Sequence, residues 1–131
     1  MARAVMEGVV YALADGLALI RALGTPVQRV IASGGAVRHP LWLQLQADIF
    51  GLEVMTSEAQ EAAAFGAALL AGAGTGVFTG VAAACEQTVR WSLQVTRPAP
   101  ARQALYARLV ERYRRLYPAL RDEFRSGSAP D

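Results

Sequence analysis

The feature that most constrains the fold of this chain is a short apolar segment that runs into two glycines. The segment from Val27 to Ala32 contains three β-branched residues, Gly34 and Gly35 follow it, and Pro40 opens the next segment. This pattern predicts a strand, a glycine turn and the start of a helix, in that order. Because glycine has no Cβ atom and tolerates positive φ, the backbone of such a turn can approach a ligand closely.

The residues alone leave two interpretations of the glycine turn. It can hold a phosphate or a nucleoside on unpaired N–H groups, or it can serve tight chain geometry only. His39 stands at the expected N-cap and Pro40 at the first helical position, where a missing N–H costs nothing. The helix expected over 40–50 carries an apolar stripe of Trp42, Leu45 and Ile49.

Apolar periodicity and turn residues predict the remaining elements. We expect helices over 2–23, 40–50, 60–73, 80–86 and 101–124, and strands over 27–32 and 52–56. Ser57 and Gln60 form a capping box before the third helix, which is expected to be buried. The segment 88–100 is expected to be irregular, with extended pairing around 89–95. This order, α-β-α-β-α with a C-terminal helical extension, indicates an α/β fold with a parallel sheet.

The predicted sheet is incomplete. Two strands rarely form a stable sheet, and the strand over 27–32 is apolar nearly throughout, like a strand covered on both faces. We therefore expect residues 1–125 to be part of a domain whose other strands lie outside this chain. Residues 126–131 are expected to be a frayed polar tail.

Composition excludes several classes of protein. The chain has 131 residues, of which 53% are hydrophobic, and a net charge of +2 carried by arginines without any lysine. One domain with a real core is expected, and disorder is not. A single histidine and a single cysteine predict no metal site, and Cys85 is expected to be a buried, inert thiol. With neither a leader nor a membrane span expected, the cytoplasm is the predicted location.

The two terminal helices carry apolar side chains at helical spacing. In the last helix, arginines and tyrosines would suit nucleic acid, whereas an amphipathic helix would place its arginines in water; acidic residues among them favour the second interpretation. Asp15, on the first helix, is expected to be solvated. The apolar residues at helical spacing in the first helix are Val5, Val9, Leu13, Gly16 or Leu17, and Ile20, and the expected inward residues of the last helix are Leu105, Leu109, Tyr113, Leu116 and Leu120.

Two motifs of this sequence resemble the FGGY carbohydrate kinases, most closely the xylulose kinases among them. Residues 33–51, with the turn Ser33-Gly34-Gly35 and the pattern Trp42-x-Gln44-x-x-Ala47-Asp48, resemble the adenosine motif of that family. Residues 61–71 are similar to its second interdomain connecting helix. The resemblance implies a partial RNase H-like domain of the actin-like ATPase fold. It also implies transfer of the γ-phosphate of ATP to a sugar hydroxyl, with xylulose as the expected sugar.

The same resemblance implies roles for particular residues. Gly34, Gly35, Ala36 and His39 would bind the nucleotide, and Mg²⁺ would arrive with ATP rather than on protein ligands. His39 stands where relatives carry Ser or Asn, so an ordinary helix cap is the alternative role for it. Asp48 is expected to be structural, through capping or pairing.

The resemblance also implies what the chain lacks. The general base would lie upstream, so we expect no catalytic residue in this chain and no activity from it in isolation. Its expected partner is the N-terminal portion of the kinase. A self-associating homodimer, joined through an exposed strand edge, is the alternative.

Overall fold

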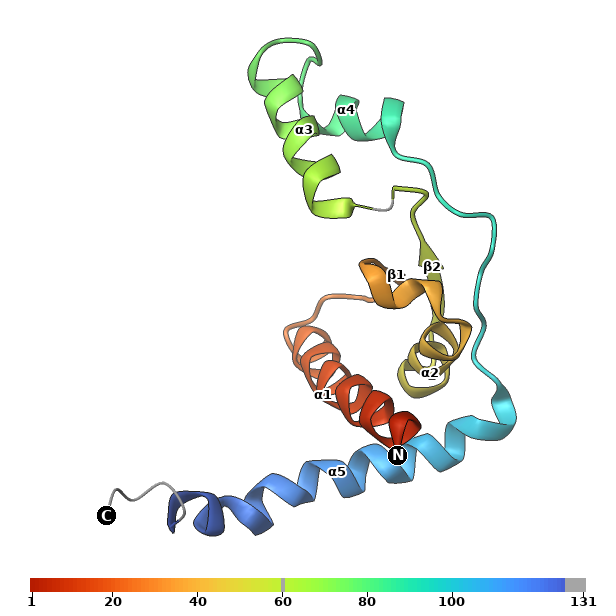
Figure 1. The fold of residues 1–131 in the computed structure, drawn as a ribbon, viewed down its shortest axis with the longest axis vertical. Helices are drawn as coiled ribbons and strands as arrows, with labels where there is room; N and C mark the ends of the chain where they lie inside the picture. Colours follow the sequence, from red (N-terminus) through yellow and green to blue (C-terminus); the bar gives the residue numbers. More distant parts are fainter. Residues whose placement is uncertain (60, 127–131) are drawn as a thin grey trace.

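The computed structural model describes residues 1–59 and 61–126. Two short strands lie at the middle of the molecule, with most of the helices on one side of them (Figure 1). The expected α-β-α-β-α order is present, with a short 3₁₀ turn, η1, that the sequence pattern did not predict. The elements are α1 (Ala2–Ala22), β1 (Arg29–Ala32), η1 (Gly35–Arg38), α2 (Pro40–Phe50), β2 (Glu53–Thr56), α3 (Ala62–Gly74), α4 (Val81–Thr88) and α5 (Pro100–Ser126).

The strands β1 and β2 are parallel, as predicted, with Val30 opposite Val54 in the register. On the other edge of β2, the segment 90–96 runs antiparallel. There Val54 and Thr96 exchange two backbone hydrogen bonds of 2.9 Å, and the N–H of Ser92 donates to the carbonyl of Thr56 at 2.9 Å. The extended pairing expected around 89–95 is therefore confirmed. Within the described residues, the outer edge of β1 has no strand beside it.

The core has two parts, and both involve α2. The larger part lies between α1, α2 and α5, and the smaller part joins α2 to the sheet through Ala32, Ala47 and Val54. Trp42 and Ile49 pack against the larger part, so the predicted apolar stripe of α2 is confirmed. The buried residues of the larger part are Val10, Tyr11, Leu45, Tyr106 and Val110.

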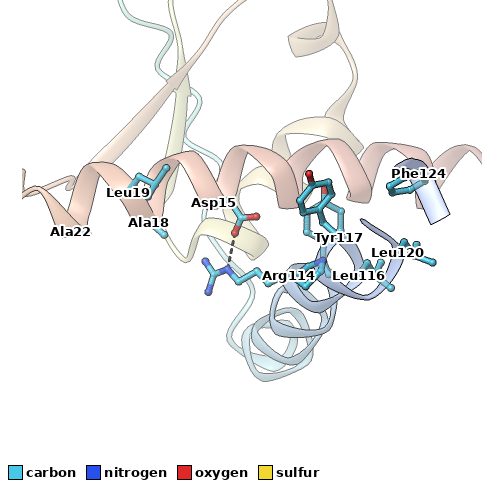
Figure 2. Close-up of a pocket in the computed structure, with 11 residues that line it drawn as sticks. Asp15, Ala18, Leu19, Ala22, Arg114, Leu116, Tyr117, Leu120 and Phe124 are labelled. Carbon is cyan, nitrogen blue, oxygen red and sulfur yellow. Dashed lines mark hydrogen bonds and ion pairs between the residues drawn. The ribbon is translucent and has the colours of Figure 1, made fainter. Parts of the chain in front are cut away.

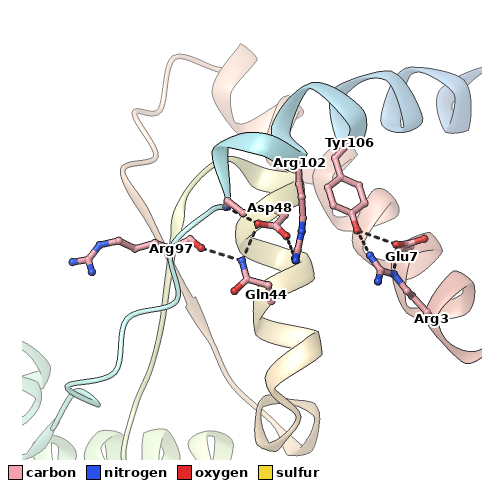
Figure 3. A network of polar contacts seen from close by, with 8 residues as sticks. Arg3, Glu7, Gln44, Asp48, Arg97, Arg102 and Tyr106 are labelled. Carbon is pink, nitrogen blue, oxygen red and sulfur yellow. Dashed lines mark hydrogen bonds and ion pairs between the residues drawn. The ribbon is translucent and has the colours of Figure 1, made fainter.

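Asp48 ties α2 to the start of α5, and its side chain is completely buried (Figure 3). Its carboxylate accepts hydrogen bonds from Gln44 Nε2 at 2.8 Å, from the N–H of Ala99 at 2.7 Å and from Arg102 Nη1 at 3.1 Å. Charge-assisted bonds of this kind offset the cost of burying a carboxylate. The structural role predicted for Asp48 is therefore confirmed.

A second polar cluster joins α1 to α5 (Figure 3). Arg3 donates to Glu7 Oε1 at 2.9 Å and to Tyr106 Oη at 3.0 Å, while the Tyr106 hydroxyl donates to Glu7 Oε1 at 2.9 Å. The buried phenol therefore has both a donor and an acceptor, which removes the cost of an unsatisfied hydroxyl.

The inward face predicted for the last helix, α5, is wrong in part. Leu105, Leu116 and Leu120 of α5 are exposed, and Tyr106 and Val110 are buried in their place. The physical reason is that α5 crosses α1 and α2 and then continues past them, so only a short stretch of it is covered (Figure 1). On α1, the apolar side chains that recur at helical spacing are also largely exposed, among them Val5, Val9, Leu13 and Ile20.

One polar residue of α1 also differs from expectation. Asp15 was expected to be solvated, but it accepts a hydrogen bond of 2.6 Å from Arg114 Nε of α5. The helix crossing brings the two oppositely charged groups together, and 39% of the Asp15 side chain is still exposed.

The hairpin of α3 and α4 extends away from the other helices (Figure 1). Its buried side chains are Leu69 and Ala84, so the prediction that α3 is a buried helix is wrong for this chain. The predicted cap is also wrong in its first member, because Ser57 Oγ donates to the carbonyl of Ala59 and the N-cap of α3 is Glu61. Gln60, the other member, lies outside the described residues.

Cys85 in α4 is half-buried and free, and so is less enclosed than expected. The helix α5 includes Ser126, which was assigned to the tail, and residues 127–131 of that predicted tail lie outside the described residues.

Candidate functional site

The glycine turn leaves backbone donors without partners. Gly34 has φ of 87°, in the left-handed region that favours glycine. The N–H of Val37 donates to the carbonyl of Gly34 at 3.2 Å, and that of His39 donates to Ala36 at 3.1 Å. In the described part of the chain, the N–H groups of Gly34, Gly35 and Ala36 have no acceptor. Three consecutive donors are therefore available to a ligand.

The space in front of the turn is open. A Cβ atom built on Gly34 or Gly35 would meet nothing within 4 Å. Packing therefore does not demand glycine at either position, and only Gly34 needs it for its backbone conformation. This open space permits an incoming group to approach the backbone closely.

A hollow of about 140 Å³ lies beside the turn. It opens where β1 and β2 end, and the carboxyl ends of parallel strands are where open α/β sheets bind ligands. Three hydroxyl side chains and the guanidinium-bearing Arg38 contribute to its lining, which contains no carboxylate. The lining residues are Ala32, Ser33, Gly34, Val37, Arg38, Thr56, Ser57 and Ala59.

The four predicted site residues are neighbours but do not all line this hollow. Gly34 lines it, whereas Gly35 and Ala36 are exposed beside it at the start of η1. His39 is the N-cap of α2, but its side chain is exposed and makes no capping hydrogen bond. Arg38, which does line the hollow, was not predicted, although it stands inside the motif that carries the glycines.

The donor set at this turn fits part of a nucleotide. Free amides, hydroxyls and a guanidinium are the groups that bind phosphate oxygens. The volume is below the roughly 300–1,000 Å³ of pockets that enclose a drug-sized ligand, so the hollow suits a group of phosphate size. A complete nucleotide would need further walls beyond those that line this hollow.

A larger hollow of about 930 Å³ lies elsewhere, between the second halves of α1 and α5 (Figure 2). Its main polar feature is the Asp15–Arg114 ion pair, and those two groups already satisfy each other. It offers an apolar surface but no set of converging donors. Its lining residues are Asp15, Ala18, Leu19, Ala22, Tyr113, Arg114, Leu116, Tyr117, Pro118, Leu120 and Phe124.

The groups whose pKa values are shifted lie between α1 and α5. Burial raises the pKa of Tyr11 to about 12 and also raises the pKa of Tyr106. The hydrogen bond to Glu7 is the main cause that raises the pKa of Arg3. These groups hold α1 against α5, so their shifts are structural.

Within residues 1–59 and 61–126, no three His, Cys, Asp or Glu side chains gather in a way that would hold a metal ion. No helix in that part of the chain has the length and apolarity to cross a membrane.

Residues 1–75 match the family profile described as the C-terminal domain of the FGGY family of carbohydrate kinases. The chain belongs to this family. It is 34% identical over 120 residues to a xylulose kinase of Bacillus subtilis, covering 92% of this chain and 24% of that protein. It is also 34% identical over 116 residues to an autoinducer-2 kinase of an Enterobacter species, covering 88% of this chain and 22% of that protein.

Solved structures show the same likeness. A ligand-bound xylulose kinase from Lactobacillus acidophilus superimposes with a TM-score of 0.83 at 28% identity, over 98% of this chain and 26% of that one. A xylulose kinase from Rhodospirillum rubrum gives a TM-score of 0.76 at 30% identity, over 93% of this chain and 25% of that one. This chain thus spans about a quarter of the length of the relatives it matches.

Proposed function

We propose that this chain is the nucleotide-side, C-terminal portion of an ATP-dependent sugar kinase of the actin-like ATPase fold, active in the cytoplasm. The reaction is transfer of the γ-phosphate of ATP to a sugar hydroxyl. The observation that supports this role most directly is the glycine turn. It presents three unpaired N–H groups beside a carboxylate-free hollow at the carboxyl ends of two parallel strands, in a member of a carbohydrate kinase family.

In phosphoryl transfer, the protein mainly positions the reacting groups and stabilises the charge on the phosphoryl group. The amides of Gly34, Gly35 and Ala36 supply donors for a phosphate or ribose oxygen, and the exposed His39 ring stands next to them. Mg²⁺ arrives with ATP and neutralises phosphate charge when bound. Asp48 does not serve as the base, because its carboxylate is buried and engaged by three donors.

Xylulose is the proposed sugar, on the strength of the xylulose kinase relatives. The autoinducer-2 kinase relative is equally similar, at 34% identity, so this portion is shared by kinases with different substrates. We therefore place the sugar-selecting residues outside this chain.

The rest of the kinase is the proposed partner. The relatives are about four times as long as this chain. The exposed apolar side chains of α1, together with Ile31 on β1, offer a surface for further chain to cover. Burial of apolar surface at about 25 cal/mol per Å² would drive that association.

The isolated chain is expected to bind ATP more weakly than about 1 mM. Charge-assisted hydrogen bonds contribute about 1.5–3 kcal/mol each, whereas association costs about 4–15 kcal/mol. Two or three amide contacts therefore leave little net affinity. Sugar-dependent ATP hydrolysis, or phosphorylation of a sugar, by the isolated chain would contradict this expectation.

The decisive experiment is complementation. The chain is co-expressed with the upstream portion of the B. subtilis xylulose kinase, and phosphorylation of xylulose and of other sugars is measured. The relative's own C-terminal portion is the positive control, and Gly34→Val in this chain is the matched negative variant, because valine is strained at φ of 87°. We expect activity with the unchanged chain only. No activity from this chain, alongside activity from the positive control, would contradict the proposal.

Self-association is the second candidate, and the apolar hollow between α1 and α5 favours it. Leu19 and Tyr117, which line that hollow, are 68% and 65% exposed. Light scattering during size-exclusion chromatography tests it. A concentration-independent monomer would count against self-association, and a dimer that the upstream portion of the kinase dissociates would favour the kinase assembly.

A further inference from the structure

Arg38 is a cation at the glycine turn that has no partner among the described residues. Arg38 is one of the residues that line the hollow, and its side chain makes no hydrogen bond or ion pair with the described residues. Several other arginines of the chain are engaged: Arg97 pairs with Glu53 at 3.0 Å, and Arg102 and Arg114 pair with buried or half-exposed aspartates. No carboxylate lines the hollow to neutralise Arg38, so its guanidinium gives the hollow a positive charge.

We propose that Arg38 binds a phosphate group of the nucleotide in this hollow. The proposal rests on the proposed kinase function and names a residue that the sequence analysis did not assign to the site. Guanidinium groups bind phosphate oxygens through paired, charge-assisted hydrogen bonds. The hydroxyls of Ser33 and Thr56 add neutral donors around the same space, whereas that of Ser57 already donates to the carbonyl of Ala59. Arg38 therefore supplies the charge that the neutral amides of the turn lack.

The size and position of the hollow support a phosphate rather than a base or a sugar ring. The hollow has a volume of about 140 Å³. It lies at the ends of β1 and β2, directly beside Gly34. Gly35 and Ala36 are exposed next to it, and their N–H groups have no acceptor among the described residues. A ligand with phosphates should thus depend on Arg38, and a nucleoside without phosphates should not.

Nuclear magnetic resonance titrations of the 131-residue chain test this dependence at weak affinity. Pyrophosphate, ADP and adenosine are each added without metal, and the amide shifts of Gly34, Gly35 and Ala36 are followed. Below saturation, the initial slope of the amide chemical-shift change against ligand concentration is inversely proportional to the dissociation constant of that ligand. For Arg38→Gln we expect the slope with ADP and pyrophosphate to fall about 10- to 100-fold, which is the value of one charge-assisted contact.

Matched variants separate this effect from general charge. Arg21→Gln removes an exposed arginine of α1 that does not line the hollow, and it should leave the ADP slope unchanged. Arg38→Lys should restore part of the slope, because it keeps the charge but loses the paired geometry. Arg38 is exposed, so Arg38→Gln should keep the dispersed amide spectrum of the folded chain.

The possible results distinguish this inference from the proposed function. An ADP slope that is unchanged in Arg38→Gln would overturn the role of Arg38 and leave the nucleotide site standing. Equal losses in Arg38→Gln and Arg21→Gln would overturn it as a nonspecific charge effect. If the turn amides of the unchanged chain respond to none of the three ligands, the proposed nucleotide site is overturned as well.

Discussion

The group formed by α1, α2 and α5 and the hairpin formed by α3 and α4 are both rich in apolar residues, but they bury them very differently. In the first group, Leu45 and Tyr106 are 1% and 2% exposed, and two polar networks join the helices. In the hairpin, Leu70 is 61% exposed and most of the alanines of α3 face outward. A high apolar content therefore does not by itself make a helix of this chain buried; the packing of neighbouring helices decides that.

The largest expected effect comes from comparing one leucine in each region. Leu45→Ala should lower the free energy of unfolding by about 2–5 kcal/mol, because it leaves a cavity between α1, α2 and α5. Leu70→Ala, on the exposed face of α3, should change it by less than about 0.5 kcal/mol. Urea denaturation followed by circular dichroism measures both. Equal losses would mean that α3 is covered in solution, by another copy or by another molecule.

The next effect tests whether the hairpin unfolds independently. A Cβ atom on Gly72 would lie 2.9 Å from two ring carbons of Phe78, so Gly72→Ala should destabilise the hairpin by about 1–3 kcal/mol. Gly66→Ala is the matched control within α3, where a Cβ meets nothing within 4 Å and helix propensity improves by about 0.5–1 kcal/mol. Amide hydrogen exchange should rise in α3 and α4 only. Faster exchange in α2 as well would show that the two regions unfold as one unit.

The smallest effect concerns pH and belongs to the first region. Burial raises the pKa of Tyr11 to about 12, so the folded chain holds this proton more tightly than the unfolded chain, where the pKa is about 10. This contribution to stability is complete below about pH 10 and is lost as the pH rises from about 10 to 12. Tyr11→Phe should remove this part of the decline. Parallel urea midpoints in both proteins across that range would contradict the assignment.

The sequence predicted those features that depend on local pattern. The helix from Pro40 to Phe50 begins and ends as expected, because a proline at its first position and Gly51 after it are strong boundary signals. The parallel strand pair and the structural role of Asp48 were also predicted. Its actual partners were not, because Ala99 and Arg102 lie about fifty residues away in the chain.

The features that depend on neighbouring elements could not be predicted in this way. Leu105 and Tyr106 are adjacent in sequence, and only the crossing of α5 over α1 decides which of them is buried. At the glycine turn, Gly34 could be predicted as a site residue, because a glycine pair between a strand and a helix is a local sequence signal. Arg38 could not, because an arginine at a helix end usually projects into water, and only the position of the hollow distinguishes it.

The reversed segment 90–96 has a consequence for how this sheet could grow. By using the outward N–H and C=O groups of Val54, it closes β2 to any additional strand on that side. Any enlargement must proceed from Arg29–Ala32 outward, so the sheet has a single direction of extension. A partner that contributes β-structure would therefore pair with β1, the strand that leads into the glycine turn.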